Sequence, residues 1–186
     1  MNEGATIRRA VPADALPLAL VLARAWAWAY RGLIEDAQLA AYVERASDLE
    51  AWFRERLGGV EGEWRTWVAE RAERVVGFAV TGPSRDADAD LATAEVWGLY
   101  LDPDFVGRGI GRALFAHAVG DLRQRGYGRA TLWVLEGNAR ARRFYEAAGW
   151  SPDGKTKIER GRGFALHEVR YRADLAASGR PAVGGP

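Results

Sequence analysis

Apolar residues recur along the N-terminal third of the chain with the periods of strands and helices. Thr6 to Ala10 predicts a short strand, and a helix is expected to start at Pro12-Ala13-Asp14 and to end at Gly32. A second helical region is predicted from about Asp36 to Leu57, before Gly58-Gly59. The apolar stripe of the first helix is assigned to Leu16, Leu20, Ala23, Ala27 and Tyr30.

Two further strands, Trp64 to Glu70 and Arg74 to Thr81, are close enough to form a hairpin. The segment from Gly82 to Leu91 is then expected to be a loop. Its aspartates at positions 86, 88 and 90 have the spacing of calcium ligands, but no glycine follows them and Trp97 stands where the last carboxylate is needed. A solvated acidic loop without a metal is therefore the prediction.

The centre of the chain combines a strand, a glycine-rich loop and an amphipathic helix. An apolar strand runs from Val96 to Leu101, a turn follows at Asp102-Pro103, and the loop Gly107 to Gly111 leads into a helix. Unpaired backbone N–H groups and the helix dipole make such a helix start suitable for a phosphate or pyrophosphate. Arg108 and Arg112 add fixed positive charges beside it.

The C-terminal third predicts a strand from Ala130 to Leu135 and a helix from Ala139 to Ala148, with Asn138 as its N-cap. The last strand is expected from Phe164 to Arg172, after a loop at 151–163. Gly149 to Thr156 matches the Walker A pattern, but we reject it because a helix precedes it and no convincing helix follows. Residues 1–172 are predicted to form a single domain and residues 173–186 a disordered tail.

Composition narrows the class of protein. The 186 residues are 48% apolar and 27% charged with a net charge of +1, which favours one globular domain and gives no reason to expect nucleic acid as a partner. The absence of cysteine excludes disulfides and thiolate sites and fits a reducing compartment. Arg8-Arg9 and the apolar run 15–23 imitate a signal peptide, but Asp14 and Pro17 interrupt the pattern. We expect a cytoplasmic protein that does not bind membranes.

Two segments resemble signatures of the GNAT-type (GCN5-related) N-acetyltransferases. Val106 to Gly111 resembles the family's Q/R-x-x-G-x-G/A motif, with both later glycines present and Val106 in place of Gln or Arg. Arg112 stands where a dinucleotide fingerprint needs Gly or Ala, which argues against that reading. Asn138 to Trp150 resembles the family's N-x-x-A-x-x-F-Y-x-x-x-G-F segment, with Trp150 for Phe.

The resemblance implies a mixed α/β sheet in a single GNAT acyl-CoA N-acyltransferase domain, with splayed central strands and about four helices. It also implies acetyl-CoA as cosubstrate and no metal. The residues expected to bind acetyl-CoA are Leu99, Tyr100, Leu101, Val106, Gly107, Arg108, Gly109, Ile110, Gly111, Arg112, Asn138 and Tyr145.

Three residues are candidates for the chemistry. Tyr145 is expected to protonate the departing thiolate, or else to be a core residue on one apolar helix face. Glu95 is either a general base or a strand-end carboxylate in a salt bridge. By resemblance, the amide of Leu99 would polarise the thioester carbonyl.

The acceptor is expected to be a primary amine of a small molecule, an amino-acid derivative or a peptide end. Trp26, Tyr30 and Glu35 are candidates to bind it, although the aromatic residues could equally be core. Aromatic and acidic residues suit a cationic amine, and a basic segment 151–163 favours an additional anionic group, so a zwitterion reconciles both. The segment's cations are Lys155, Lys157, Arg160 and Arg162.

Other functions remain open at this point. The chain could instead acetylate protein N-termini or lysines, or it could be a non-catalytic acyl-CoA sensor, which Val106 in the phosphate motif would suit. Either a monomer or a homodimer is compatible with the sequence.

Overall fold

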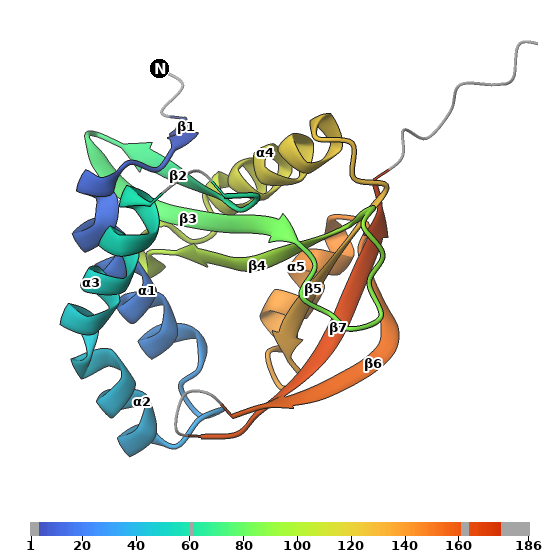
Figure 1. Ribbon diagram of the computed structural model, residues 1–186. Coiled ribbons are helices and arrows are strands. Elements are labelled where there is room, and N and C mark those ends of the chain that lie inside the picture. The colour runs from blue at the N-terminus through green and yellow to red at the C-terminus, as the bar shows by residue number, and fades with distance from the viewer. Residues whose placement is uncertain (1–3, 60–61, 161–163, 176–186) are drawn as a thin grey trace, which may run out of the picture.

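Seven strands form one mixed sheet in the order β1-β2-β3-β4-β5-β7-β6 (Figure 1). The computed structural model describes residues 4–59, 62–160 and 164–175. Neighbouring strands are antiparallel except β4 and β5, which are parallel. The strands are β1 Thr6–Arg9, β2 Arg65–Arg71, β3 Arg74–Pro83, β4 Thr93–Leu101, β5 Arg129–Leu135, β6 Ser151–Glu159 and β7 Leu166–Asp174.

Helices cover both sides of the sheet. α1 to α3 lie together beside β3 and β4, and α4 lies across the opposite side, with α5 behind β5 (Figure 1). Short 3-10 helices at Pro12–Asp14 and Pro103–Phe105 precede α1 and α4. No helix in the described ranges is long and apolar enough to cross a membrane. The α-helices are α1 Ala15–Ala29, α2 Asp36–Glu44, α3 Ala46–Gly58, α4 Ile110–Gln124 and α5 Ala139–Ala147.

The described chain thus has five α-helices where about four were expected. The predicted helical region from Asp36 to Leu57 is two helices, because Arg45 interrupts the regular helix between them. The expected hairpin is present, and its two-residue turn places Ala72 and Glu73 at positive φ.

The two central strands separate partway along their length. Their parallel ladder contains only four pairs, from Thr93 opposite Arg129 to Val96 opposite Leu132. Beyond this point the two strands diverge, which Figure 1 shows as the widening gap between β4 and β5. The predicted mixed α/β sheet with splayed central strands is confirmed.

The core bridges both halves of the splayed sheet. On one side, Leu18 and Trp26 of α1 belong to the same apolar cluster as Phe78 of β3. On the other side, α4 buries Leu114 against β3 and Phe115 in a cluster with β5 and α5. Because burying each large apolar side chain contributes about 1.5–3 kcal/mol, α4 holds the strands together on either side of the gap.

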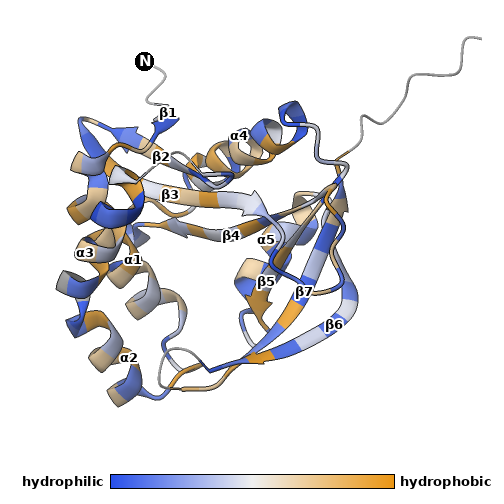
Figure 2. Cartoon of the chain, in the orientation of Figure 1, coloured by the Kyte–Doolittle hydropathy of each residue, from blue (hydrophilic) through white to orange (hydrophobic). Residues whose placement is uncertain are grey.

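The predicted loop between the last two strands is wrong over most of its length. Residues 151–159 form β6, which pairs with β7 and has a register shift between Pro152 and Thr156. Gly154 within this irregularity has a φ of +85°. Figure 2 colours β6 mostly as hydrophilic, so hydropathy gives little sign of the strand. A strand here supports the rejection of Walker A, since the chain after Lys155 continues as β6 to Glu159 and does not begin a helix there.

The C-terminal boundary lies later than predicted. β7 continues to Asp174 rather than ending at Arg172, and Leu175 is only 2% exposed. The packed part of the chain therefore extends three residues past the expected limit. Residues 176–186 of the predicted tail lie outside the described residues.

Candidate active site

A cavity of about 1060 Å³ occupies the gap between β4 and β5. Its lining comes from the end of α1, the loop before α4, the first turns of α5 and one face of β6 and β7. Ten of the twelve residues predicted to bind acetyl-CoA line it: Leu99, Tyr100, Leu101, Val106, Gly107, Gly109, Gly111, Arg112, Asn138 and Tyr145.

The other two predicted residues do not line the cavity. Arg108 is exposed and its guanidinium lies 5.6 Å from the centre of the Phe105 ring. Ile110 is buried and packs into the cluster beneath α4. A different cation, Arg140 of α5, lines the cavity together with Arg112.

A buried carboxylate fixes the turn that leads into the glycine-rich loop. Asp102 is 1% exposed and accepts hydrogen bonds from Arg24 of α1 at 3.1 Å and from Arg74 of β3 at 2.8 Å. It also accepts one from the backbone N–H of Asp104 at 3.1 Å. The loop is therefore anchored to two separate elements before it reaches α4.

The backbone at the start of α4 leaves room and donors for an anion. Gly107 and Gly109 both have a φ of +81°, and no heavy atom lies within 4 Å of the place where a Cβ of either would stand. Gly109 is the N-cap, and its carbonyl accepts the N–H of Ala113 at 3.1 Å. The N–H groups of residues 110–112 precede this first helical hydrogen bond, so a pyrophosphate fits this helix start.

The ladder geometry directs the amide of Leu99 into the gap. The N–H of Asp102 donates to the carbonyl oxygen of Val76, directly opposite on β3, at 2.8 Å. Hydrogen-bonded and non-hydrogen-bonded pairs alternate along an antiparallel ladder, so Leu99, opposite Ala79, belongs to a non-hydrogen-bonded pair. Its N–H points away from β3 toward β5, and among the described strands the ladder to β5 has already ended at Val96.

The Tyr145 ring is packed in the core, and the residue also lines the cavity. The ring centre lies 5.5 Å from that of Phe115 and 5.4 Å from that of Phe144. Burial raises the pKa of the Tyr145 phenol above its usual value, and charge on nearby Tyr100 adds to the effect. The side chain therefore carries its proton at neutral pH.

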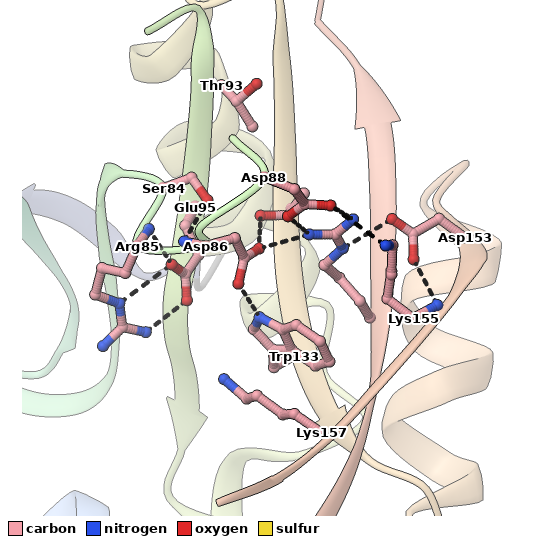
Figure 3. Close-up of polar contacts among 12 residues, drawn as sticks. Ser84, Arg85, Asp86, Asp88, Thr93, Glu95, Trp133, Asp153, Lys155 and Lys157 are labelled. Carbon is pink, nitrogen blue, oxygen red and sulfur yellow. Dashed lines mark hydrogen bonds and ion pairs between the residues drawn. The ribbon is translucent and has the colours of Figure 1, made fainter. Parts of the chain in front are cut away.

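Glu95 lines the cavity from β4 and forms the salt bridge that was one of its two predicted roles (Figure 3). The carboxylate is almost fully buried and accepts hydrogen bonds from the backbone N–H of Arg85 at 3.0 Å and from its Nε at 3.1 Å. This pairing holds the carboxylate in one orientation.

The prediction of a solvated acidic loop is wrong for Asp86, whose side chain is only 12% exposed, whereas the Asp88 side chain is 48% exposed. Arg170 of β7 is 8% exposed and donates to Asp86 at 3.0 Å, to Asp88 at 2.7 Å and to Asp153 at 2.8 Å. Figure 3 shows these carboxylates facing one another across β7, with the Trp133 indole donating to Asp86. The hydrogen bond from Arg170 lowers the pKa of Asp88 to about 2.

Only two of the three residues predicted to bind the acceptor line the cavity. Trp26 and Tyr30 line the cavity, but Trp26 is 2% exposed and stacks on Tyr42, with ring centres 4.2 Å apart. Glu35 is exposed and does not line the cavity. Of the predicted basic residues, Lys155 pairs with Asp88 and Lys157 with Glu168, while Arg162 lies outside the described residues.

The sequence did not predict the lining residues on β5–β7. These include Trp133, Glu159 and Glu168, and their signal is alternation along a strand, which places every second residue on one face; β6 was not recognised and the face was not assigned. Lining residues from other elements were also missed, among them Arg85 and Asp86 of the β3–β4 loop, Trp97 of β4 and Arg140 of α5.

Residues 25–150 match the sequence profile of the acetyltransferase (GNAT) family. The chain belongs to this family. No curated protein matches the sequence significantly.

Solved structures of GNAT proteins share the fold. A GCN5-related N-acetyltransferase from Rhodopseudomonas palustris is 22% identical, with a TM-score of 0.73 over 92% of this chain and 96% of that one. A ribosomal-protein-alanine N-acetyltransferase from Brucella melitensis is 26% identical, with a TM-score of 0.62 over 91% and 99%. The PaiA N-acetyltransferase from Thermoplasma acidophilum, solved with coenzyme A, is 19% identical, with a TM-score of 0.67 over 91% and 98%.

Membership of the GNAT family confirms the predicted family and the expectation of acetyl-CoA as cosubstrate, since acetyl-CoA is the acetyl donor of these enzymes. Within the described residues, no group of three or more histidine, aspartate or glutamate side chains could hold a metal ion.

Proposed function

We propose that this protein is an N-acetyltransferase that moves the acetyl group of acetyl-CoA directly to a primary amine. The observation that supports this most strongly is that one cavity joins the start of α4, the Leu99 amide, Tyr145 and Glu95. A binding site for the donor and groups for both proton transfers therefore open into a single space. The lack of cysteine also favours direct transfer, because no thiol is available to carry the acetyl group.

The donor would be held by its pyrophosphate at the start of α4. Backbone N–H groups of residues 110–112, the helix dipole and Arg112 are complementary to its negative charge. Asn138 and the backbone of β4 would contact the pantetheine arm. The donor supplies an activated acetyl group as a thioester.

The Leu99 N–H would stabilise negative charge on the thioester oxygen. A donor that is fixed by the β3–β4 ladder and directed into the gap needs no rearrangement as charge develops. Removal of one such donor from an enzyme typically slows turnover about 10²–10³-fold.

Tyr145 would protonate the departing thiolate. Burial raises the phenol's pKa, which keeps the proton available, and the same apolar surroundings make the thiolate more basic because they disfavour every anion. Transfer of the proton leaves a neutral thiol, although it requires the two groups to be matched in basicity.

Glu95 would receive the proton of the incoming ammonium, directly or through water. Forming a neutral amine from an ammonium of pKa near 10.4 costs about 4–5 kcal/mol at pH 7. A carboxylate oriented by Arg85 on the cavity wall is suited to accept that proton as the nitrogen attacks.

Acetylation of protein N-termini remains the second candidate, because one 26% identical structure is named a ribosomal-protein-alanine N-acetyltransferase. The deciding experiment measures CoA thiol release with and without a panel of free amines and peptides. Amine-dependent release supports an enzyme. Tight acetyl-CoA binding without release in the presence of any acceptor would favour the acyl-CoA sensor.

We also place the protein in the cytoplasm, in keeping with its lack of cysteine.

A further inference from the structure

The orientation of the Glu95 carboxylate depends on one residue of the β3–β4 loop. Within the described residues, all of its hydrogen bonds come from the backbone N–H and the guanidinium of Arg85 (Figure 3). The Glu95 side chain is 2% exposed, whereas that of Arg85 is 56% exposed. An exposed arginine loses conformational entropy when it is held in one geometry, which weakens its ion pairs. The place of Glu95 on the cavity wall therefore depends on what restrains the Arg85 guanidinium.

An indole ring on β4 contacts this guanidinium. The β3–β4 ladder shifts register between Val80 and Thr81, which leaves Trp97 as the extra residue of a bulge on β4. Trp97 and Glu95 both line the cavity. The Arg85 guanidinium lies 4.5 Å from the centre of the Trp97 ring, within the range of a cation–π contact. Arg85 thus contacts the carboxylate and the indole ring together.

The Trp97 ring is itself fixed to the end of β3. Its indole N–H donates to the carbonyl oxygen of Pro83 at 3.2 Å. The edge of the ring lies against the backbone of Gly82, where an added Cβ would stand 3.1 Å from the Cζ2 atom of Trp97. Both contacts come from residues just before Arg85 in the chain, so the ring and the start of the loop that carries Arg85 hold one another in place.

A second cation lies near the same ring. The guanidinium of Arg56, on α3, is 5.6 Å from the centre of the Trp97 ring and 4.4 Å from that of Trp64. Burial and the charge of Arg85 lower the pKa of Arg56. Because like charges repel, Arg56 disfavours a rotation of Arg85 away from Glu95 and toward α3.

We infer that Trp97 is a positioning residue, which holds the Arg85 guanidinium against Glu95 and thereby keeps the carboxylate in place on the cavity wall. Its effect on the reaction passes through Arg85 and Glu95. This inference rests on the proposed function for the role of Glu95, but the contact between Arg85 and Glu95 can be measured without turnover.

The Nε–H group of Arg85 reports this contact, since a hydrogen-bonded N–H exchanges slowly with water. Its nitrogen-15 NMR signal is assigned by its loss in Arg85→Lys. Trp97→Leu should speed the exchange about tenfold, and Trp97→Phe, which keeps an aromatic face, should restore much of the protection. Trp67→Leu is the matched control, because the guanidinium of Arg9 lies 5.4 Å from the Trp67 ring but this ring does not line the cavity. Unchanged exchange in Trp97→Leu would overturn the inference.

Kinetics test whether the contact serves the reaction. Trp97→Leu should lower kcat/KM at pH 7 about tenfold with little change in KM for acetyl-CoA, and the loss should shrink toward pH 10, where an alkylamine loses its proton unaided. In protein that already carries Glu95→Gln, Trp97→Leu should have no further effect, because a residue that acts through Glu95 has no role without it. An equal loss with and without Glu95→Gln would show that Trp97 acts on the acceptor itself and would overturn the inference.

The two measurements keep this inference separate from the proposed function. Faster Arg85 exchange in Trp97→Leu with a wild-type rate in Glu95→Gln would support the positioning contact and contradict the base. A slow Glu95→Gln with unchanged exchange in Trp97→Leu would have the opposite meaning. If Trp97→Leu does not fold, Gly82→Ala displaces the ring without removing it and should also speed the exchange. Unchanged exchange in that variant would equally overturn the inference.

Discussion

The Tyr145 ring is packed and also lies on the cavity wall. Removing the phenol oxygen alone separates its role in packing from its role as a proton donor. Tyr145→Phe keeps the contacts with Phe115 and Phe144 but removes the proton donor. We expect kcat to fall about 10²-fold while KM for acetyl-CoA changes little, as steady-state kinetics would measure. Tyr127→Phe, which removes a phenol outside the cavity lining, is the matched control. A wild-type kcat in Tyr145→Phe would show that the residue has only a packing role.

Glu95 is tested by the pH dependence of the rate. Glu95→Gln should lower kcat/KM at pH 7, because no carboxylate receives the ammonium proton. The deficit should shrink as the pH approaches about 10, where an alkylamine loses its proton unaided. Asp121→Asn provides a control, since Asp121 is also a buried carboxylate paired with an arginine but lies outside the cavity lining. A loss of kcat/KM that stays constant with pH would mean that Glu95 only forms the salt bridge and is not the base.

The sequence predicts the place of some site residues but not of others. Tyr145 and Gly109 are recognised because each stands in a short motif with fixed spacing. Arg170 is not, because its partner Asp86 lies 84 positions away and the contact depends on how the β3–β4 loop crosses β7. Long-range pairing between charged residues has no local signal of this kind.

At the level of elements, the glycine-rich loop is expected to work through its backbone. Gly109→Val should weaken CoA binding at least about tenfold, because a side chain at positive φ strains the N-cap and projects into the space for the phosphates. Calorimetric titration of folded protein measures the change. Gly126 also has a positive φ, of +87°, but does not line the cavity, so Gly126→Val should cost stability without loss of CoA affinity. Unchanged affinity in Gly109→Val would contradict the pyrophosphate assignment.

The sequence predicted an element and its buried positions correctly where one face is clearly apolar. The prediction failed where apolar and polar residues did not separate onto two faces. α4 has its predicted buried positions, including Leu114 and Leu122. α1 is apolar around most of its circumference, so periodicity chose Leu16 and Leu20, which are half exposed, instead of Leu18. β6 was missed because the segment is hydrophilic and contains proline and glycine, which are rare in strands. It is a strand because it pairs with β7.

For the whole molecule, Arg170 ties the β3–β4 loop to the C-terminal strands. Arg170→Gln should lower Tm by about 5–10 °C, because removing one partner of a buried ion pair leaves carboxylates without their cation. Arg172→Gln, on the same strand but exposed, should change Tm little. Thermal unfolding of both variants provides the comparison, and equal small shifts would show that the ion pairs contribute little.

The difference in Tm between wild type and Arg170→Gln should become smaller in acid. Asp88 has its pKa lowered to about 2 in the folded protein, so its contribution is present above the ordinary aspartate pKa near 3.9 and is lost as the pH falls toward 2. The gap in Tm between wild type and Arg170→Gln should therefore narrow between pH 4 and pH 2. A gap that widens in this range would contradict the assignment.

The splayed sheet as a whole followed from family resemblance, whereas the side chains on the β5–β7 side of its cavity did not. Motifs at the start of α4 and in α5 predict where the donor lies. The β5–β7 side depends on which faces of these strands meet the β3–β4 loop, a property of the assembled sheet.

Direct acetyl transfer in this cavity is tested most directly by a single-turnover reaction with excess protein, in which acetyl-CoA reacts with the amine that gives the fastest CoA release in the acceptor panel, and the quenched products are analysed by mass spectrometry. Direct transfer should give one acetylated amine for each CoA thiol released and no acetyl group on the protein. Release of CoA without acetylated amine, or an acetyl group retained on the chain, would contradict it.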